Sequence, residues 1–308
     1  MRIGSMGNAT SAEDMRAFSE FLLKVGEGRH EFNPTLGREY MKIPSDMLID
    51  NPPDEPIEDA DIHPDAIPKG MERLIDFMYA DVNNPDVTTD EYFADRTILT
   101  TTNAMVHRIN AAVADRLPDA AHEYLSFDSM EDDASGNFFE PEVLHTININ
   151  GIPPHRLILK KGIPIMMMRN LNPDLGLCNG TRLRIVELKP RVIHATIMEG
   201  ERKGQHVLIP QIIFVSDDDT RDFPFRLRRK QIPVQPAFAM TINKAQGQTV
   251  MNLGLYLASP CFSHGQLYVA LSRVTARSNF KALLEYPELE EDDGAYTSNI
   301  VYRQIFDA

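Results

Sequence analysis

Four short segments rich in β-branched and apolar residues follow one another between residues 157 and 215, with no helical segment between them. Turn-forming stretches such as NLNPDLGLCNG join them. Strands at this spacing, without intervening helices, are typical of a small barrel. The central part of the chain is therefore predicted to fold as a β-barrel, built from LILKKGIPIMMMR, TRLRIVEL, VIHATIME and HVLIPQIIFV.

A strand, a polar loop and a helix are predicted in succession on each side of this barrel. Before it, a short strand at 97–101 leads through a polar turn into a helix capped by Asn103. After it, residues 237–249 (AFAMTINKAQGQT) run from an apolar strand into a polar loop, and a strand at 253–258 precedes a helix at 264–274. This succession is the unit of an α/β sheet, so the barrel is predicted to be an insertion within one α/β domain.

The N-terminal part of the chain is predicted to contain two helices and a long connection. Residues 11–28 have a capping serine, Ser11, and one apolar face, which predicts a helix. Residues 68–81 begin with Pro68 and also carry one apolar face. Between them, residues 29–67 are rich in Pro, Asp and Asn and are predicted to form a surface connection.

Charge is distributed unevenly along the 308 residues, whose formal net charge is −14. Residues 46–95 hold fifteen acidic side chains against two basic ones, whereas residues 155–248 hold sixteen Lys and Arg against eight Asp and Glu. The second region is basic enough to hold several phosphates, although a solvated surface would have the same composition. Charge alone leaves both interpretations open.

Several classes of protein are excluded or disfavoured by composition. No apolar run approaches the roughly 18 residues of a membrane span, and the N-terminus lacks the apolar core of a signal peptide. An intracellular location is therefore expected, in the nucleus or, as the alternative, the mitochondrion. The two cysteines, Cys178 and Cys261, are far apart and have no histidine cluster beside them, so no disulfide framework and no metal site are expected.

The segment FAMTINKAQGQTV (238–250) carries polar donors at the end of a predicted strand. Thr241, Asn243 and Lys244 offer hydroxyl, amide and ammonium groups, which suit an anion or a nucleic-acid backbone. Gly247 would let the main chain approach a ligand closely. An ordinary polar turn after a strand explains the same residues equally well.

A second group of donors stands at a predicted helix N-terminus. Thr101, Thr102 and Asn103 in TTTNAMVHRIN precede the helix, where free N–H groups and the positive end of the helix dipole can hold a phosphate. A capped helix without any ligand is the alternative.

The third group lies on the helix predicted at 264–274. Gln266, Ala270 and Arg273 share one face at helical spacing. An arginine fixed on a packed helix can reach into a cleft and neutralise phosphate charge, as arginine fingers do. An exposed arginine in an ordinary salt bridge is the alternative.

A complete nucleotide-binding site is not found in the sequence. The phosphate-binding loop GxxxxGK[ST] is missing, because Gly-Lys occurs nowhere in the chain. No apolar strand ends in the Asp-Glu pair that would hold magnesium.

These motifs, taken in order, closely resemble the petite-integration-frequency (PIF) family of superfamily-one DNA helicases, especially the form carried by Helitron transposons. The resemblance covers roughly residues 96–285 and, more loosely, 1–50. It rests on TTTNAMVHRIN, GIPPHRLILKKGIPIMMMRNLNPDLGLCNGTRL, FRLRRKQIPVQPAFAMTINKAQGQTV and FSHGQLYVALSRV.

The resemblance implies an α/β fold whose main part is a RecA-like second motor domain of the P-loop-NTPase type. A small barrel like that of Src-homology-three domains would be inserted into it. A helical and irregular remnant of the first motor domain would precede it. The implied bounds are 1–93 for the remnant and an acidic linker, 94–150 plus 222–290 for the motor domain, 151–221 for the barrel and 291–308 for a C-terminal tail.

The resemblance also implies roles for individual residues. Family members hold ATP between two motor domains and single-stranded DNA across the top of both. Arg273 would be the catalytic arginine finger, and Gly247, Gln248, Gln266 and Arg2 would belong to the nucleotide-binding set. The DNA backbone would meet Thr101, Thr102, Asn103, Thr241, Asn243 and Lys244.

The expected function is that of the C-terminal part of an ATP-dependent DNA helicase. Its implied partners are single-stranded DNA and the first RecA-like motor domain, and a monomer is expected. ATP and Mg²⁺ are cofactors of the full motor, and neither is expected to be held by this chain alone, so no ATPase activity is expected from it by itself. The alternative is a non-catalytic module that binds single-stranded DNA through the barrel and the basic surface.

Overall fold

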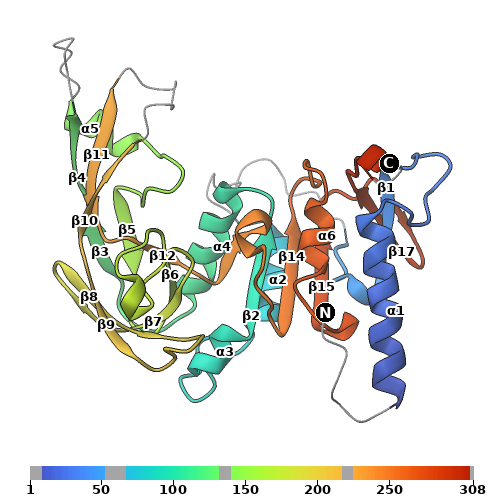
Figure 1. Ribbon diagram of the computed structural model, residues 1–308, viewed down its shortest axis with the longest axis horizontal. Helices are drawn as coiled ribbons and strands as arrows, with labels where there is room; N and C mark the ends of the chain where they lie inside the picture. The colour runs from blue at the N-terminus through green and yellow to red at the C-terminus, as the bar shows by residue number, and fades with distance from the viewer. Residues whose placement is uncertain (1–8, 53–66, 132–139, 217–224, 306–308) are drawn as a thin grey trace. The chain divides into compact units, whose positions relative to one another are not determined.

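The computed structural model describes residues 9–52, 67–131, 140–216 and 225–305 (Figure 1). The chain divides into two compact units. Unit 1 comprises residues 1–88, 95–113 and 238–308, and unit 2 comprises residues 89–94 and 114–237. Each unit is thus assembled from segments that are distant in the sequence.

A four-stranded parallel sheet forms the core of unit 1, in the order β13-β2-β14-β15. Strand β14 is buried at every position after its first residue, Asn252. Parallel strands are usually covered on both faces and therefore lack the alternation of a half-exposed strand. The strands span Arg96–Thr100 (β2), Ala239–Thr241 (β13), Asn252–Leu257 (β14) and Phe280–Leu284 (β15).

Helix α2 (Lys69–Met78) packs on this sheet through the apolar face that its sequence predicts. The contact is close at Gly254, where a Cβ would lie only 2.9 Å from the Cγ of Met78. A larger residue there would push the helix away from the sheet. None of the described helices is long and apolar enough to cross a membrane. The other helices of unit 1 are α1 (Ala9–Gly26), α4 (Asn103–Asp115) and α6 (Gln266–Leu271), with 3-10 turns at Ser45–Met47, Ile242–Ala245, Arg277–Asn279 and Arg303–Ile305.

Both helices predicted in the N-terminal part are confirmed, with small shifts at their ends. Helix α1 ends at Gly26, the glycine stop of the predicted segment. Helix α2 begins at Lys69, so Pro68 occupies the capping position before the first turn.

A small antiparallel sheet of unit 1 joins the N-terminal and C-terminal parts of the chain. Strand β1 (Tyr40–Pro44) pairs with β17 (Gly294–Ser298), which pairs with β16 (Leu289–Glu291). The predicted surface connection and the predicted C-terminal tail therefore contain paired strands. These strands are only three to five residues long, too short for a sustained hydrophobic pattern in the sequence.

Unit 2 consists mainly of antiparallel strands, in three sheets (Figure 1). The largest has the order β12-β6-β7-β8-β9, and the others are β10-β11-β4 and β3-β5. Two short helices, α3 (Asp90–Ala94) and α5 (Pro141–Thr146), and a 3-10 turn at Pro173–Leu175 accompany them. The strands are His122–Leu125 (β3), Phe127–Glu131 (β4), Arg156–Leu159 (β5), Pro164–Met167 (β6), Arg182–Lys189 (β7), Val192–Ile197 (β8), His206–Pro210 (β9), Ile212–Val215 (β10), Arg226–Gln231 (β11) and Val234–Pro236 (β12).

The β-rich character predicted for residues 157–215 is confirmed, although the four predicted segments form six strands. The predicted domain bounds at 150 and 222 both fall inside unit 2. The reason is strand pairing: β4 pairs with β11, and β3 pairs with β5. Residues 122–131 therefore pack with the later strands instead of with the parallel sheet, a pairing that no local pattern reveals. Closure of the strands into a barrel stays a prediction.

Candidate functional site

The carboxyl ends of three parallel strands of unit 1 carry most of the predicted site residues. Strand β13 lies next to β2, and its last residue, Thr241, pairs with Thr100. Because neighbouring parallel strands end at the same edge of a sheet, the residues that follow them meet there. We call this edge, formed by residues 101–103, 241–245 and 258–262, the carboxyl edge. It holds all six residues predicted to contact DNA, namely Thr101, Thr102, Asn103, Thr241, Asn243 and Lys244.

Strand β13 is held in place by a buried amide on helix α4. The Oδ1 atom of Asn110 accepts hydrogen bonds from the backbone N–H groups of Phe238, at 3.0 Å, and Ala239, at 2.9 Å. The hydroxyl of Tyr79 donates to the carbonyl of Phe238 at 2.7 Å. Strand β13 is at the edge of its sheet, and these side chains satisfy backbone groups near its start. They fix the position from which Thr241 and Lys244 project.

Helix α4 begins differently from the prediction. Its first residue is Asn103, and the backbone N–H of Met105 donates to the Oγ1 atom of Thr102 at 3.4 Å. Thr102 therefore occupies the capping position, and the predicted cap at Asn103 is wrong by one residue. Thr101 is buried, with its Oγ1 atom 3.5 Å from the Oγ of Ser259 in the loop after β14. Thr102 and Asn103 remain exposed and accessible to a ligand.

Lys244 has a histidine neighbour, His107, that the sequence motifs did not identify. Burial lowers the pKa of His107, and the nearby positive charge of Lys244 lowers it further. Desolvation also lowers the pKa of Lys244 itself, although the residue is exposed. His107 lies one helical turn after Asn103, and this spacing was the signal that could have revealed it. A phosphate placed beside Lys244 would relieve both unfavourable effects.

Arg273 contacts the loop that contains Gly247 and Gln248. One guanidinium nitrogen, Nη1, donates to the carbonyl of Gln248 at 2.9 Å and to that of Ala245 at 3.3 Å. The Nε atom donates to the carbonyl of Val269 at 2.8 Å. Gly247 has a φ of +84°, and a Cβ there would meet open space, so the loop needs glycine for its conformation. Two of the four predicted nucleotide-binding residues, Gly247 and Gln248, therefore lie beside the predicted arginine finger, and Arg273 holds their loop.

The other two predicted nucleotide-binding residues differ in placement. Gln266 is 3% exposed, and its Oε1 atom accepts a hydrogen bond from the backbone N–H of Phe262 at 3.0 Å. Its amide thus fixes the loop before helix α6 and does not face solvent. Helix α6 ends at Leu271, so Arg273 lies beyond the helix on which it was predicted. Arg2 lies outside the described residues.

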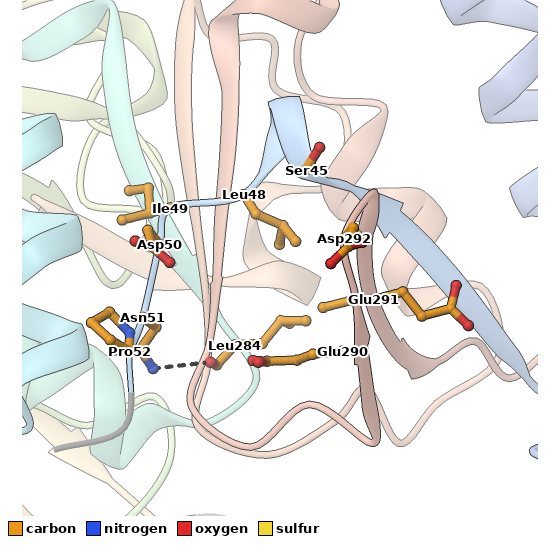
Figure 2. Close-up of a pocket in the computed structure, with 12 residues that line it drawn as sticks. Ser45, Leu48, Ile49, Asp50, Asn51, Pro52, Leu284, Glu290, Glu291 and Asp292 are labelled. Carbon is orange, nitrogen blue, oxygen red and sulfur yellow. Dashed lines mark hydrogen bonds between the residues drawn. The ribbon is translucent and has the colours of Figure 1, made fainter.

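A cavity of about 380 Å³ lies elsewhere in unit 1 (Figure 2). It is bounded partly by Leu48 and Leu284, and the side-chain amide of Asn51 donates to the carbonyl of Leu284 at 3.2 Å. None of the predicted site residues lines it. Its negative charge disfavours a nucleotide, because the rim carries Asp50, Glu290, Glu291 and Asp292.

Among the described residues, one group in unit 2 has the composition of a metal site: Asp128, His145 and His155. Its hydrogen bonds are already made within the protein. Both carboxylate oxygens of Asp128 accept from the guanidinium of Arg229, at 2.9 and 2.8 Å. The rings of His145 and His155 stack 3.7 Å apart, and Ser126 bonds to both Asp128 and His155. The group forms a partly buried polar network in which Arg229 already neutralises the carboxylate of Asp128.

Known proteins match this chain over part of its length. A family model for the 2B domain of the DNA helicase Pif1 matches residues 142–188. The ATP-dependent DNA helicase PIF1 of Homo sapiens is 29% identical over 177 residues, which cover 54% of this chain and 24% of that protein. The ATP-dependent DNA helicase Pif1 of Bdellovibrio bacteriovorus is 34% identical over 119 residues, covering 39% of this chain and 25% of that protein. The chain thus spans about a quarter of the length of these curated relatives.

Solved structures give matches of the same kind. The Pif1 helicase of Candida albicans matches with a TM-score of 0.48 and 22% identity, covering 71% of this chain and 54% of that one. Bacteroides Pif1 bound to single-stranded DNA matches with a TM-score of 0.46 and 21% identity, covering 68% and 44%. The family-model match and the sequence relatives agree with the ordered motifs, and over these residues the chain is similar to the C-terminal part of Pif1-family DNA helicases.

Proposed function

We propose that the chain is the C-terminal motor part of an ATP-dependent DNA helicase, and that its carboxyl edge binds the backbone of single-stranded DNA. The observation that carries this proposal is the cluster of Lys244, His107 and the exposed Thr102 and Asn103 at the ends of adjacent strands. Ammonium, imidazole, hydroxyl and amide groups all donate hydrogen bonds to phosphate oxygens. The sequence relatives named as ATP-dependent DNA helicases support the same class of partner.

The loop of Gly247 and Gln248 would face the γ-phosphate of ATP in the full motor, with Arg273 beside it. Residues of a first RecA-like motor domain would hold ATP and Mg²⁺, and Arg273 would stabilise charge that develops on the transferred phosphate. In the present arrangement the guanidinium donates to backbone carbonyls of its own unit. A phosphate would be bound beside these bonds, or in exchange for one of them, when nucleotide and first motor domain are present.

The same contacts favour one alternative, a non-catalytic module that binds single-stranded DNA. An arginine whose three guanidinium nitrogens all donate within its own unit serves the fold without any nucleotide. In this alternative, the isolated chain would bind DNA with its full affinity. Neither nucleotide nor a first motor domain would change that affinity.

The DNA contact is tested by a salt titration of oligothymidine binding to the full chain. Lys244→Gln is expected to weaken binding and to reduce the slope of log K against log salt by about 0.7, the value for one phosphate contact on a single strand. Lys24→Gln, which removes an exposed charge from helix α1, is the matched control and should leave the slope unchanged. Equal slopes for Lys244→Gln and the wild-type chain would rule out the carboxyl edge as the phosphate site.

The two candidate functions differ in their response to nucleotide. The purified chain is expected to hydrolyse no ATP, whereas addition of a Pif1-family first motor domain in trans is expected to restore hydrolysis that Arg273→Ala abolishes. Turnover by the chain alone, lost in Arg273→Ala, would contradict the need for a first motor domain. Nucleotide-independent DNA binding with no restoration of ATPase activity would favour the module.

A further inference from the structure

Two histidines meet on the largest sheet of unit 2, where strands β8 and β9 run antiparallel (Figure 1). His206 pairs with Thr196, and His194 pairs with Leu208. The two histidines are therefore diagonal neighbours on one face, a separation that aromatic side chains can span. The Nε2 atom of His194 lies 2.9 Å from the Nδ1 atom of His206. We call these two residues the histidine pair.

The histidine pair stands on the solvent side of strands whose other side is buried. Strands β8 and β9 both alternate between buried and more exposed residues, and the two histidines occupy more exposed positions. The buried positions between them are Ile193, Ala195, Ile197, Val207 and Ile209. An apolar face thus anchors both strands, while the imidazole rings are accessible from water. An ion could reach them without any rearrangement of the core.

The distance between the two nitrogens suits chelation of a single metal ion. Imidazole nitrogen binds transition metals at about 2.0–2.1 Å, so donors 2.9 Å apart would subtend an angle of roughly 90° at one ion. Neighbouring ligands of square-planar and octahedral ions make this angle, and Cu²⁺ and Ni²⁺ prefer such geometries. Rotation of each ring would turn both lone pairs toward the ion, which would replace the proton of the present hydrogen bond.

The neighbouring strand β7 adds a carboxylate to the same face. Glu187 pairs directly with His194, and its side chain is 53% exposed. Two cations of β7 are also on this face, but both are already paired. The Nζ atom of Lys189 lies 3.1 Å from one oxygen of Glu187, and Nη1 of Arg184 lies 3.2 Å from Oδ1 of Asp90. The second oxygen of Glu187 can serve as a further metal ligand.

The group of Asp128, His145 and His155 is less suited to a metal ion than the histidine pair. Both carboxylate oxygens of Asp128 accept from the guanidinium of Arg229, so a divalent cation there would be repelled by a fixed positive charge. The facing nitrogens of the histidine pair bind each other instead. The sequence did not reveal this pair, because the two histidines are 12 residues apart and meet only where β8 and β9 run side by side.

We propose that the histidine pair binds one divalent transition-metal ion, with Glu187 as a further ligand and water in the remaining positions. The angle between the two nitrogens favours Cu²⁺ and Ni²⁺ over tetrahedral Zn²⁺. Strand β9 is at the edge of its sheet, so the ion would cross-link this edge strand to β8. The site requires neither DNA nor nucleotide, and it is independent of the function proposed for the carboxyl edge.

The test is isothermal titration of Ni²⁺ into the full chain without an affinity tag. The wild-type chain is expected to bind one ion with high affinity. His194→Gln and His206→Gln should each weaken binding about tenfold or more, since even the loss of a partner outside the ligand set costs that much. Glu187→Gln should cause a smaller loss. Electron paramagnetic resonance of bound Cu²⁺ should show coupling to two imidazole nitrogens in the wild-type chain and to one in each histidine variant.

Matched controls in the same unit separate this site from other histidines. His122→Gln removes a partly exposed histidine of β3, and His155→Gln removes one of the group that includes Asp128. Both variants should bind Ni²⁺ like the wild-type chain. A stability measurement adds an independent readout, because an ion that binds only the folded chain raises the urea midpoint. Ni²⁺ should raise the midpoint of the wild-type chain and of His122→Gln, but not that of His194→Gln.

Three results would overturn the inference. The first is a wild-type chain that binds neither Ni²⁺ nor Cu²⁺ in a one-to-one ratio. The second is an affinity of His194→Gln and His206→Gln equal to that of the wild-type chain. The third is a loss of binding in His155→Gln with full binding in the variants of the histidine pair, which would assign the ion to the group of Asp128.

Discussion

Arg273 has a second role at the scale of a single residue, whatever it does to a nucleotide. Its Nη1 atom bonds to the carbonyls of Ala245 and Gln248, and its Nη2 atom donates to the hydroxyl of Ser272 at 2.8 Å. Desolvation lowers its pKa, because neighbouring atoms replace part of its hydration shell. These bonds shape the loop that would face the phosphate. A variant at this position would therefore alter the loop as well as remove a charge.

Arg273→Ala is accordingly expected to lower the free energy of unfolding by about 1.5–3 kcal/mol, the range for hydrogen bonds that involve a charged group. Urea denaturation followed by circular dichroism measures the change. Arg277→Ala is the control, since Arg277 is 40% exposed and forms a surface ion pair with Asp46. Its expected cost is below about 1 kcal/mol. If the two variants are equally stable, the structural role assigned to Arg273 is excluded.

Among the helices and strands, the sequence predicted those whose ends or buried faces are marked by residues within the element itself. Helix α1 has a glycine stop, and α2 has an apolar stripe, so both were predictable. The motif around Thr241 and Lys244 was also predictable, because a short apolar strand ends in a run of donors.

Partners that are distant in the sequence could not be predicted from those signals. Asn110 appears in the sequence as one polar residue within a helix, yet its amide binds the backbone of Phe238 across a separation of 128 residues. Strand β4 was placed with the motor domain because nothing local shows that it pairs with β11. The gathering of Arg273, Gly247 and Gln248 followed from the family resemblance, whereas the hydrogen bonds that occupy Arg273 depend on side-chain geometry alone.

His155, which stacks on His145, is expected to make the stability of unit 2 depend on pH. Burial lowers the pKa of His155, as do the neighbouring charges of His145 and Arg229, while Asp128 raises it. Below the ordinary histidine pKa of about 6.5, the unfolded chain binds a proton that the folded chain does not bind. The free energy of unfolding should therefore fall as the pH decreases from about 7 toward 5. This range lies above the ordinary pKa values of carboxylates. His30 and His107, whose pKa values are also lowered, act in the same direction.

The urea midpoint at pH 7.5 is expected to exceed that at pH 5.5, and His155→Gln should make this difference smaller. His206→Gln, which replaces an exposed histidine of the same unit, is the control and should keep the wild-type difference. An unchanged pH dependence in His155→Gln would show that the stacked pair does not cause it.

At the scale of the whole molecule, the chain leaves unit 2 at two places, and one buried arginine binds the backbone at both. The side chain of Arg182 is 3% exposed. It donates to the carbonyls of Phe93, at 2.8 Å, and Ala94, at 3.1 Å, and to that of Ala237, at 3.3 Å. Ala94 and Ala237 are the last residues of unit 2 before the chain continues in unit 1. Arg182 thereby ties together two ends of unit 2 that are far apart in sequence.

Arg182→Met, which keeps an unbranched side chain, is expected to destabilise unit 2 by at least about 2 kcal/mol, because each buried acceptor left unsatisfied costs roughly 1–3 kcal/mol. Hydrogen exchange should accelerate first at residues 89–94 and 234–237. Arg184→Met on the same strand is the control, since Arg184 has a side chain that is 26% exposed and bonds to Asp90. Uniform acceleration over unit 2 in both variants would contradict a local role for Arg182.

The alternation of the chain between the two units has a consequence for its synthesis. Strand β2 is made early, but both of its neighbours, β13 and β14, emerge from the ribosome only after residues 114–237 are complete. Most of unit 2 can therefore fold while β2 still has two unpaired edges. Such a strand is a template for pairing with other chains, so the nascent polypeptide is exposed to this hazard for as long as the insertion takes to translate.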